Sequence, residues 1–336
     1  MISPVDISSA STALVSTPSA DLLPFFVALV GPTGVGKSAI AVHLARAVGG
    51  EIIALDSMQV YRRLDIGTAK PTPVEQKGIP HHLIDIVDPA DPFTAADYAR
   101  LARQVLKEIH SRGGLPLVVG GSGLYLRALR GEIFPGPREV TSIRARLGEE
   151  VEKGGPEVLH ARLNRLDPPT AARIHSRDSF RLIRALEIIE ITGKRVSELW
   201  EAHRKELAQS SVLFLGLRRE RTELYRRIND RVDRMFASGL VEEVKQLLEE
   251  GYPSDLKPFR SHNYRHIAAL LLGQEDLEDS VQRTKQETRH YAKRQMTWFR
   301  REKEITWFDL TDAESRRTTE TLIERIQRLR GRYGTA

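Results

Sequence analysis

Short apolar runs alternate with amphipathic segments over the first third of the chain. Continuous apolar runs are typical of strands buried on both faces, and helical periodicity between them indicates connecting helices. Thr94, with Asp97 three residues later, marks the start of one such helix. Together these segments predict an α/β fold with a parallel sheet covered on both sides. The predicted strands are residues 25–30, 51–55, 82–86 and 115–119, and the predicted helices include residues 39–48 and 94–112.

The pattern changes after the fourth of these strands. Residues 127–209 show one helical pattern after another and no convincing strand, whereas residues 212–217 are again a continuous apolar run. We therefore predict a helical insertion domain at 127–209. It interrupts an α/β core with a helical C-terminal part, made of residues 25–126 and 210–336. The elements expected near the end of the core are a helix at 282–301 and a last strand at 305–308.

Composition adds bounds on the class of protein. The 336 residues exceed what one hydrophobic core usually organises, which agrees with two domains. No apolar stretch reaches the length of a membrane span, and the absence of cysteine excludes disulfides, thiolate metal sites and a cysteine nucleophile. Residues 1–24 are rich in Ser, Ala, Thr and Pro and lack the regions of a secretory signal, so we predict a disordered leader. A cytoplasmic protein without membrane partners is expected.

A phosphate-binding motif follows the first predicted strand. It has the form G-x-x-x-x-G-K-S and stands between a strand and a helix, where backbone N–H groups can surround an anion. The lysine adds a point charge, and the serine hydroxyl is placed to hold Mg²⁺. A plain glycine-rich turn is the weaker alternative, and the motif does not identify the phosphate compound. Its residues are Gly31, Pro32, Thr33, Gly34, Val35, Gly36, Lys37 and Ser38.

Two further segments end strands at the same predicted edge of the sheet. Asp56 follows strand 51–55 and could be a general base, a magnesium ligand or a helix cap. The strand at 115–119 ends in Gly120-Gly121-Ser122-Gly123, where an ordinary P-loop NTPase would carry an acid. This sequence argues for close approach of the backbone to a ligand, with Ser122 offering a hydroxyl, and against a water-activating ATPase. A simple tight turn is the alternative.

Basic residues gather in two predicted helices. Residues 282–303 contain eight Lys or Arg and two Glu, against a net charge of +6 for the whole chain. A row of phosphates would suit the polar face of this helix, and a solvated face is equally consistent with it. That face carries Gln282, Gln286, Arg289, Lys293 and Arg300, beside an apolar stripe of Ala292, Met296 and Phe299. His175, Asp178, Arg181 and Arg184 are three apart on another helix, where spacing alone favours ion pairs within the helix.

The chain resembles the tRNA dimethylallyltransferases, or tRNA A37 isopentenyltransferases, of the bacterial type. The resemblance extends over nearly all of residues 25–310 and rests on six segments in order. They are Gly31–Ser38, Asp56–Tyr61, Asp65–Pro71, Gly120–Tyr125, His175–Glu187 and Lys293–Trp298.

The resemblance implies a reaction. Members transfer a dimethylallyl group from dimethylallyl diphosphate to N6 of adenosine 37 in tRNAs that read codons beginning with U. The resemblance implies that the phosphate-binding loop holds the diphosphate. Lys37, Ser38 and Mg²⁺ would then stabilise the departing group. Asp56 matches the family's general base. Ser122 stands where the family usually has Thr, and keeps the hydroxyl of that channel position.

The resemblance also implies an RNA partner, the anticodon stem-loop of tRNA, bound by a monomeric enzyme. The target base must leave the loop stack, and RNA contacts must offset that cost. The residues that match RNA-contacting segments are Asp56, Ser57, Met58, Gln59, Arg144, Asp178, Arg181, Arg184, Arg289, Lys293, Arg294 and Arg300.

One segment departs from the family pattern. Asn263 precedes Tyr264-Arg265 where members usually have Gly. Asn adopts the left-handed conformation more readily than most residues, so the same turn is expected. Three other functions stay open on the residues themselves: a nucleoside or nucleotide kinase using the loop on ATP, an adenylate prenyltransferase, and a non-enzymatic RNA-binding protein.

Overall fold

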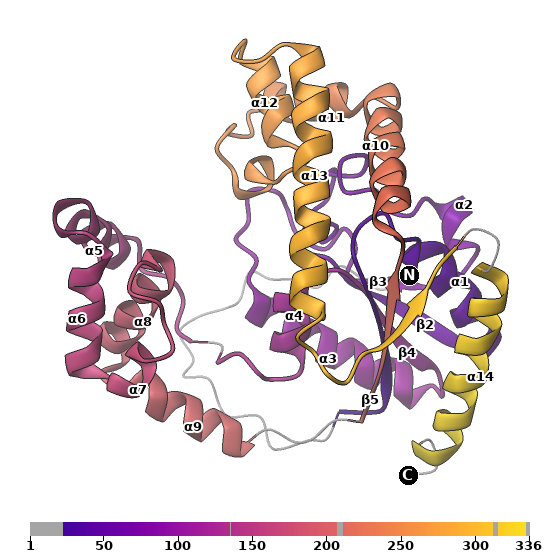
Figure 1. Ribbon diagram of the computed structural model, residues 1–336, viewed down its shortest axis with the longest axis horizontal. Helices are drawn as coiled ribbons and strands as arrows, with labels where there is room; N and C mark the ends of the chain where they lie inside the picture. Colours follow the sequence, from indigo (N-terminus) through magenta and orange to yellow (C-terminus); the bar gives the residue numbers. More distant parts are fainter. Residues whose placement is uncertain (1–22, 135, 207–210, 312–314, 334–336) are drawn as a thin grey trace. The chain divides into compact units, whose positions relative to one another are not determined.

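The computed structural model describes residues 23–134, 136–206, 211–311 and 315–333. The chain divides into two compact units, each described here by itself (Figure 1). The core unit comprises Leu23–Glu139 and Ser210–Ala336, and the helical unit contains Val140–Gln209. Most of the predicted leader lies outside the described residues.

The core unit is organised around a six-stranded sheet in which every pair of neighbouring strands is parallel. The strand order is β3-β2-β4-β1-β5-β6. β1 has β4 on one side and β5 on the other, and all five of its residues are buried, which explains its continuous apolar sequence. The strands are β1 (Phe26–Val30), β2 (Gly50–Leu55), β3 (His81–His82), β4 (Leu115–Gly120), β5 (Val212–Arg218) and β6 (Thr306–Asp309).

Alternate residues of β1 face two different hydrophobic cores. Ala28 and Val30 belong to a core that also contains side chains of α3, α4 and α11. Val27 and Leu29 belong to the other core, with side chains of α1, α10 and α14. Helices therefore cover both faces of the sheet, as the sequence pattern predicts. The helices of the first part are α1 (Lys37–Val48), α2 (Pro73–Gln76), α3 (Ala95–Ser111) and α4 (Gly123–Leu129).

The C-terminal part of the core unit is mostly helical. Helices α10, α11 and α12 stand beyond the end of the sheet at which β5 ends, and the longer helix α13 runs from there to α4 (Figure 1). Within the described ranges, no helix has the length and apolar character needed to cross a bilayer. The elements are α10 (Arg221–Ala237), α11 (Leu240–Glu249), the 3₁₀ helix η1 (Lys257–Arg260), α12 (Arg265–Leu271), α13 (Leu277–Phe299) and α14 (Ser315–Tyr333).

The helical unit packs five helices around buried leucines such as Leu147, Leu163 and Leu186. It begins at Val140, later than the predicted boundary at residue 127. Residues 127–139 fall in the core unit, because α4 buries Leu126 and Leu129 against the sheet. The helices are α5 (Thr141–Gly154), α6 (Pro156–Leu166), α7 (Pro168–Ala171), α8 (Ser179–Thr192) and α9 (Val196–Glu206).

Most predicted elements agree with the observed ones to within a few residues, and one does not. The predicted strand 82–86 is wrong beyond His82, because Leu83 and Asp85 have positive φ values of 61° and 57°. That conformation is incompatible with an extended strand. The helix predicted from Thr94 has the capping box formed by Thr94 and Asp97.

Candidate active site

The phosphate-binding loop connects β1 to α1 and needs glycine for two reasons. Gly34 and Gly36 have φ values of 80° and 111°, which favour glycine. Gly31 lies against the backbone of β5, where a Cβ would collide with the carbonyl oxygen of Leu217. The loop is thus a tightly wound backbone held against the centre of the sheet, with its C-terminal end at the start of α1.

Lys37 is enclosed by the loop that precedes it. Its Nζ donates hydrogen bonds to the carbonyl oxygens of Gly31 at 3.0 Å and Pro32 at 2.9 Å. Burial and the nearby charge of Arg231 lower the pKa of Lys37 to about 8, although Asp56 acts in the opposite direction. A bound anion would favour the protonated ammonium and raise this pKa again.

Three arginines that follow the helical unit in the sequence donate hydrogen bonds to the same loop. Arg219 Nε donates to the carbonyl oxygen of Val35 at 3.0 Å, and Arg227 Nε to that of Gly34 at 3.1 Å. Arg231 Nη1 lies 3.4 Å from Thr33 Oγ1. These arginines were not among the residues predicted from the sequence. The available signal was the four-residue spacing of Arg227 and Arg231 on a helix that directly follows a buried strand.

Asp56 lies just past the end of β2. Its Oδ1 accepts hydrogen bonds from the backbone N–H groups of Met58 at 2.8 Å and Gln59 at 3.3 Å, so the side chain caps the following turn. Burial raises the pKa of Asp56, against these hydrogen bonds and the charges of Lys37 and Arg231. The carboxyl group and the phosphate-binding loop therefore share one electrostatic site.

The residues after Asp56 are half-buried. Gln59 Nε2 donates to the carbonyl oxygens of Thr68 at 3.1 Å and Ala69 at 3.2 Å. Its amide therefore holds the segment 65–71 in place. Ser57 and Met58 are partly accessible, and RNA contact by them stays a prediction.

The turn that contains Ser122 is bonded to the strand that ends at Asp56. The N–H groups of Gly121 and Ser122 both donate to the carbonyl oxygen of Leu55 at 3.1 Å. Ser122 also caps α4, because its Oγ accepts from the N–H of Tyr125 at 3.4 Å. The structure thus brings Ser122 and Asp56 to neighbouring strand ends, as predicted for the carboxyl edge of the sheet.

Two of the three glycines of this turn are explained by a helix. A Cβ on Gly121 would collide with Gln295 Nε2, and a Cβ on Gly123 would collide with the Trp298 ring. Both side chains belong to α13. The sequence predicts close approach of a ligand at these glycines, whereas the close neighbour of Gly121 and Gly123 is α13.

Gln295 joins the phosphate-binding loop to the serine turn. It is 7% exposed, its Oε1 accepts from the N–H of Thr33 at 2.8 Å, and its Nε2 donates to the carbonyl oxygen of Gly121 at 3.0 Å. Gln295 was not among the residues predicted from the sequence. The sequence feature that could have identified it is its position: Gln295 lies one helical turn from both Ala292 and Phe299, inside the apolar stripe of α13. A polar group buried there needs hydrogen-bond partners.

Aromatic side chains are buried beside Asp56. The rings of Tyr98 and Tyr125 stack with centroids 4.4 Å apart and an angle of 23° between their planes. Burial raises the pKa values of both hydroxyls, and the charge of Asp56 adds to the effect. Two buried tyrosine rings therefore lie close enough to Asp56 for its charge to act on their hydroxyls.

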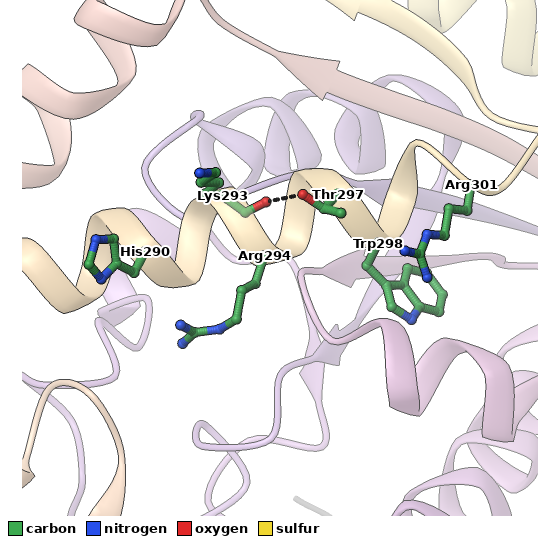
Figure 2. A pocket seen from close by; sticks show the side chains of 6 residues that line it. All are labelled: His290, Lys293, Arg294, Thr297, Trp298 and Arg301. Atoms are coloured by element: carbon green, nitrogen blue, oxygen red, sulfur yellow. Dashed lines mark hydrogen bonds between the residues drawn. The ribbon is translucent and has the colours of Figure 1, made fainter. Parts of the chain in front are cut away.

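The outer face of α13 carries the exposed cations. A cavity of about 450 Å³ lies against it, and Arg294 and Trp298 extend to the same side of the helix in Figure 2. Arg289 is instead directed to α10, where its Nη1 donates to Asn229 Oδ1 at 2.6 Å. Arg300 is exposed at the C-terminal end of the helix. The cavity is lined by His290, Lys293, Arg294, Thr297, Trp298 and Arg301.

The predicted RNA-binding residues of the helical unit differ in their surroundings. Asp178 caps α8 by accepting from the N–H of Arg181 at 3.1 Å. Arg144 and Arg184 both bind the carboxylate of Glu187, which is fully buried. The side chain of Arg181 is 70% exposed. Of these four residues, Arg181 has the charge most accessible to a partner.

Asn263 does not use a left-handed backbone. The described non-glycine residues with positive φ do not include it, so that expectation is wrong. Its side chain bridges two segments instead: Nδ2 donates to the carbonyl oxygen of Gly67 at 2.6 Å, and Oδ1 accepts from Thr288 Oγ1 at 3.0 Å. The Asn263 side-chain amide therefore links the 65–71 segment to α13, and this position does not need a left-handed backbone conformation.

The donor groups for a metal ion are few. Among the described residues there is no group of three or more His, Cys, Asp or Glu side chains that could hold one. Ser38 is exposed in the first turn of α1. One hydroxyl at a phosphate cradle fits Mg²⁺, which keeps several waters and binds largely through substrate phosphates.

Fold and site together define a class: a P-loop α/β protein in which the Gly31–Ser38 loop shares its electrostatic site with the half-buried carboxyl group of Asp56. The chain belongs to the IPP transferase family, whose model matches residues 59–302, and it is an enzyme of that family.

Similar proteins support this assignment over most of the chain. A tRNA dimethylallyltransferase from Syntrophobacter fumaroxidans is 50% identical over 302 residues, which cover 90% of this chain and 86% of that protein. The crystal structure of the tRNA isopentenylpyrophosphate transferase from Bacillus halodurans is 42% identical, with a TM-score of 0.68 over 91% of this chain and 96% of that one. A eukaryotic dimethylallyltransferase acting on tRNA is 31% identical, with a TM-score of 0.76 over 89% and 77%.

Proposed function

We propose that the chain transfers a dimethylallyl group from dimethylallyl diphosphate to N6 of adenosine 37 in tRNAs that read codons beginning with U. The observation that carries this proposal is the pairing of a phosphate cradle with Asp56, whose pKa is raised by burial, at one edge of the sheet. The curated relatives that bear the name tRNA dimethylallyltransferase support the choice of donor and acceptor. The product is N6-(dimethylallyl)adenosine.

The phosphate-binding loop holds the leaving group. As the C–O bond to the diphosphate breaks, negative charge grows on the departing oxygens. The loop N–H groups and Lys37 stabilise that charge, and Arg227 and Arg231 keep the loop in shape through Gly34 and Thr33. When bound, Mg²⁺ supplies further charge neutralisation, with the Ser38 hydroxyl as its protein ligand.

Asp56 removes a proton from the acceptor. The exocyclic amine is a weak nucleophile because its lone pair is delocalised into the purine ring. It forms the C–N bond to the allyl carbon and loses one proton, which Asp56 accepts. A raised pKa makes this carboxylate a better base than an ordinary surface aspartate. Ser122, on the adjacent strand end, helps to position the amine.

The acceptor is bound by the basic surfaces. Lys293 and Arg294 on α13 and Arg181 on α8 are exposed cations suited to phosphates. Trp298, in the wall of the α13 cavity, offers a surface on which an unstacked base can rest. The enzyme is expected to act as a monomer in the cytoplasm.

The test is a reconstituted reaction. Purified protein, dimethylallyl diphosphate, Mg²⁺ and bulk tRNA are incubated, and the tRNA nucleosides are analysed by mass spectrometry. N6-(dimethylallyl)adenosine is expected with the wild type and not with Lys37→Ala. Parallel incubations with ATP and nucleosides address a kinase, and a phosphorylated nucleoside without prenylated adenosine would overturn the proposal.

A further inference from the structure

Phe180, on α8 of the helical unit, is unusually exposed for an aromatic residue. Its side chain is 70% exposed, whereas the neighbouring Leu182 and Leu186 on the same helix are fully buried. Exposing a phenyl ring to water costs free energy, and the packing of α8 does not require the ring, because other positions bury the helix. The ring is therefore available to an external apolar partner.

The ring has an ordered cation beside it. The Arg144 guanidinium carbon lies 6.0 Å from the Phe180 ring centroid, within range of a cation–π contact. Arg144 is itself fixed: its Nε and Nη2 donate to the carboxylate of Glu187 at 3.1 Å. Burial alone would raise the pKa of Glu187, but hydrogen bonds from Arg144 and Arg184 outweigh it and keep the pKa low. The buried ion pair thus supports one side of an exposed ring.

Positive charge predominates in the segment that carries the ring. Residues 173–184 contain four arginines and one acidic residue, Asp178. The side chains of Arg177 and Arg181 are 80% and 70% exposed, and their pairs with Glu157 at 3.6 Å and Asp178 at 3.5 Å are surface contacts of little energy. These cations can exchange such partners for phosphates. An exposed ring among exposed cations matches the chemistry of single-stranded nucleic acid binding, in which bases stack on aromatic rings and phosphates pair with cations.

We infer that Phe180 is a stacking platform for one unpaired base of the RNA acceptor, with Arg177 and Arg181 holding the flanking phosphates. The inference rests on the proposed function, because it takes the acceptor to be an RNA loop. It adds an aromatic contact in the helical unit, separate from the α13 cavity and from the base that reacts.

The test combines changes in the protein with changes in the RNA. Binding of an anticodon stem-loop RNA to the full chain is measured for the wild type, Phe180→Leu and Phe180→Trp. Loss of the ring is expected to weaken binding by roughly 5- to 150-fold, the range for one stacked base. Phe180→Trp should bind at least as well as the wild type. Val158→Ala, which alters another exposed apolar side chain of the helical unit, should have no effect.

Abasic RNAs identify the partner of the ring. Each unpaired loop position is made abasic in turn, and the binding of each RNA to the wild type and to Phe180→Leu is compared. At one position the Phe180→Leu effect should vanish, because the base that it contacts is already absent. Equal effects of Phe180→Leu on every RNA, or no effect at all, would overturn the inference.

The proposed function and the inference fail in different ways. Prenyl transfer by the wild type together with an unaltered Phe180→Leu variant would remove only the stacking platform. Absence of RNA binding and prenyl transfer in the wild type would remove both. A Phe180→Leu loss of activity with unchanged RNA affinity would also overturn stacking, and would assign the ring to contacts within the protein.

Discussion

The proposed phosphate-binding site of the core unit and the α8 face of the helical unit both gather basic residues, but the surroundings of those residues differ. In the core, Arg227 and Arg231 point at a loop, and the enclosed Lys37 has a pKa lowered to about 8. On α8, the charge of Arg181 is in solvent. Enclosed charges act at short range on one small anion and on protonation, whereas exposed charges attract a large polyanion and are screened by salt.

The ion pairs of Glu187 show which arginines of the helical unit have a structural role. Glu187 is the buried carboxylate that binds Arg144 and Arg184, so two of the predicted RNA-binding arginines have structural partners. The ion-pair partner that the structure gives Arg181 is Asp178, whose side chain is partly exposed. An arginine whose carboxylate partner is buried is held within the protein, whereas an arginine with an exposed partner can bind RNA. Burial of the carboxylate distinguishes the two better than position on the helix.

The largest expected effect is at Asp56, and it tests the enclosed site. Asp56→Asn keeps an oxygen for the N–H groups of Met58 and Gln59 but removes the base, so the turn should persist. Prenyl transfer should fall by about 10²–10⁴-fold with little change in tRNA affinity. Single-turnover rates measure this, and near-normal turnover would assign Asp56 to capping alone.

The next effect concerns the joint between loop and helix. Gln295→Ala leaves the N–H of Thr33 and the carbonyl of Gly121 without their partner, which should cost about 1–3 kcal/mol of unfolding free energy. Gln286→Ala, an exposed amide of the same helix, is the matched control and should change stability by less than ~0.5 kcal/mol. Urea denaturation compares the two, and equal stabilities would contradict the role assigned to Gln295.

A matched pair of arginines tests the comparison within α8. Arg184→Ala should lower stability by roughly 1–3 kcal/mol, because it removes a hydrogen bond to a buried carboxylate. Arg181→Ala should leave stability unchanged, weaken RNA binding and reduce the slope of log affinity against log salt by about 1. If both variants behaved alike in melting and binding, the distinction by burial would fail.

The smallest expected effect is the uptake of a fraction of a proton when the diphosphate binds. With a pKa of about 8, Lys37 is partly deprotonated near pH 8 in the free enzyme, and a bound diphosphate should raise that pKa. Binding should therefore take up a fraction of a proton near pH 8, and affinity should fall as the pH rises through that value. Calorimetry in two buffers of different ionisation enthalpy measures the uptake, and Lys37→Arg, which does not titrate there, should abolish it.

The sequence predicts the sheet well because its strands are buried on both faces. Residues such as those of β1 must then be apolar throughout, whatever lies elsewhere in the chain. The error at residues 82–86 has the opposite origin: Leu83 and Asp85 have positive φ, and their backbone follows contacts with a distant segment, such as the N–H of Asp85 donating to the carbonyl of Gln59.

The site is predictable in part. The phosphate-binding loop and Asp56 can be found because local spacing defines them. Spacing can mark Arg227 and Gln295 as residues of interest, but it cannot assign their partners or that of Arg219, because those partners lie 174 to 262 residues away along the chain. Such contacts form only when the strands have taken their order in the sheet. No local sequence pattern specifies that order.

The contact between the serine turn and α13 also has a consequence for how this sequence can change over time. Gly123 touches the ring of Trp298, and Gly121 touches Gln295, with no room for a Cβ at either glycine. An alanine at either position can be accepted only after the facing side chain has become smaller or has moved. The turn and the helix are therefore expected to evolve as one unit, through paired substitutions.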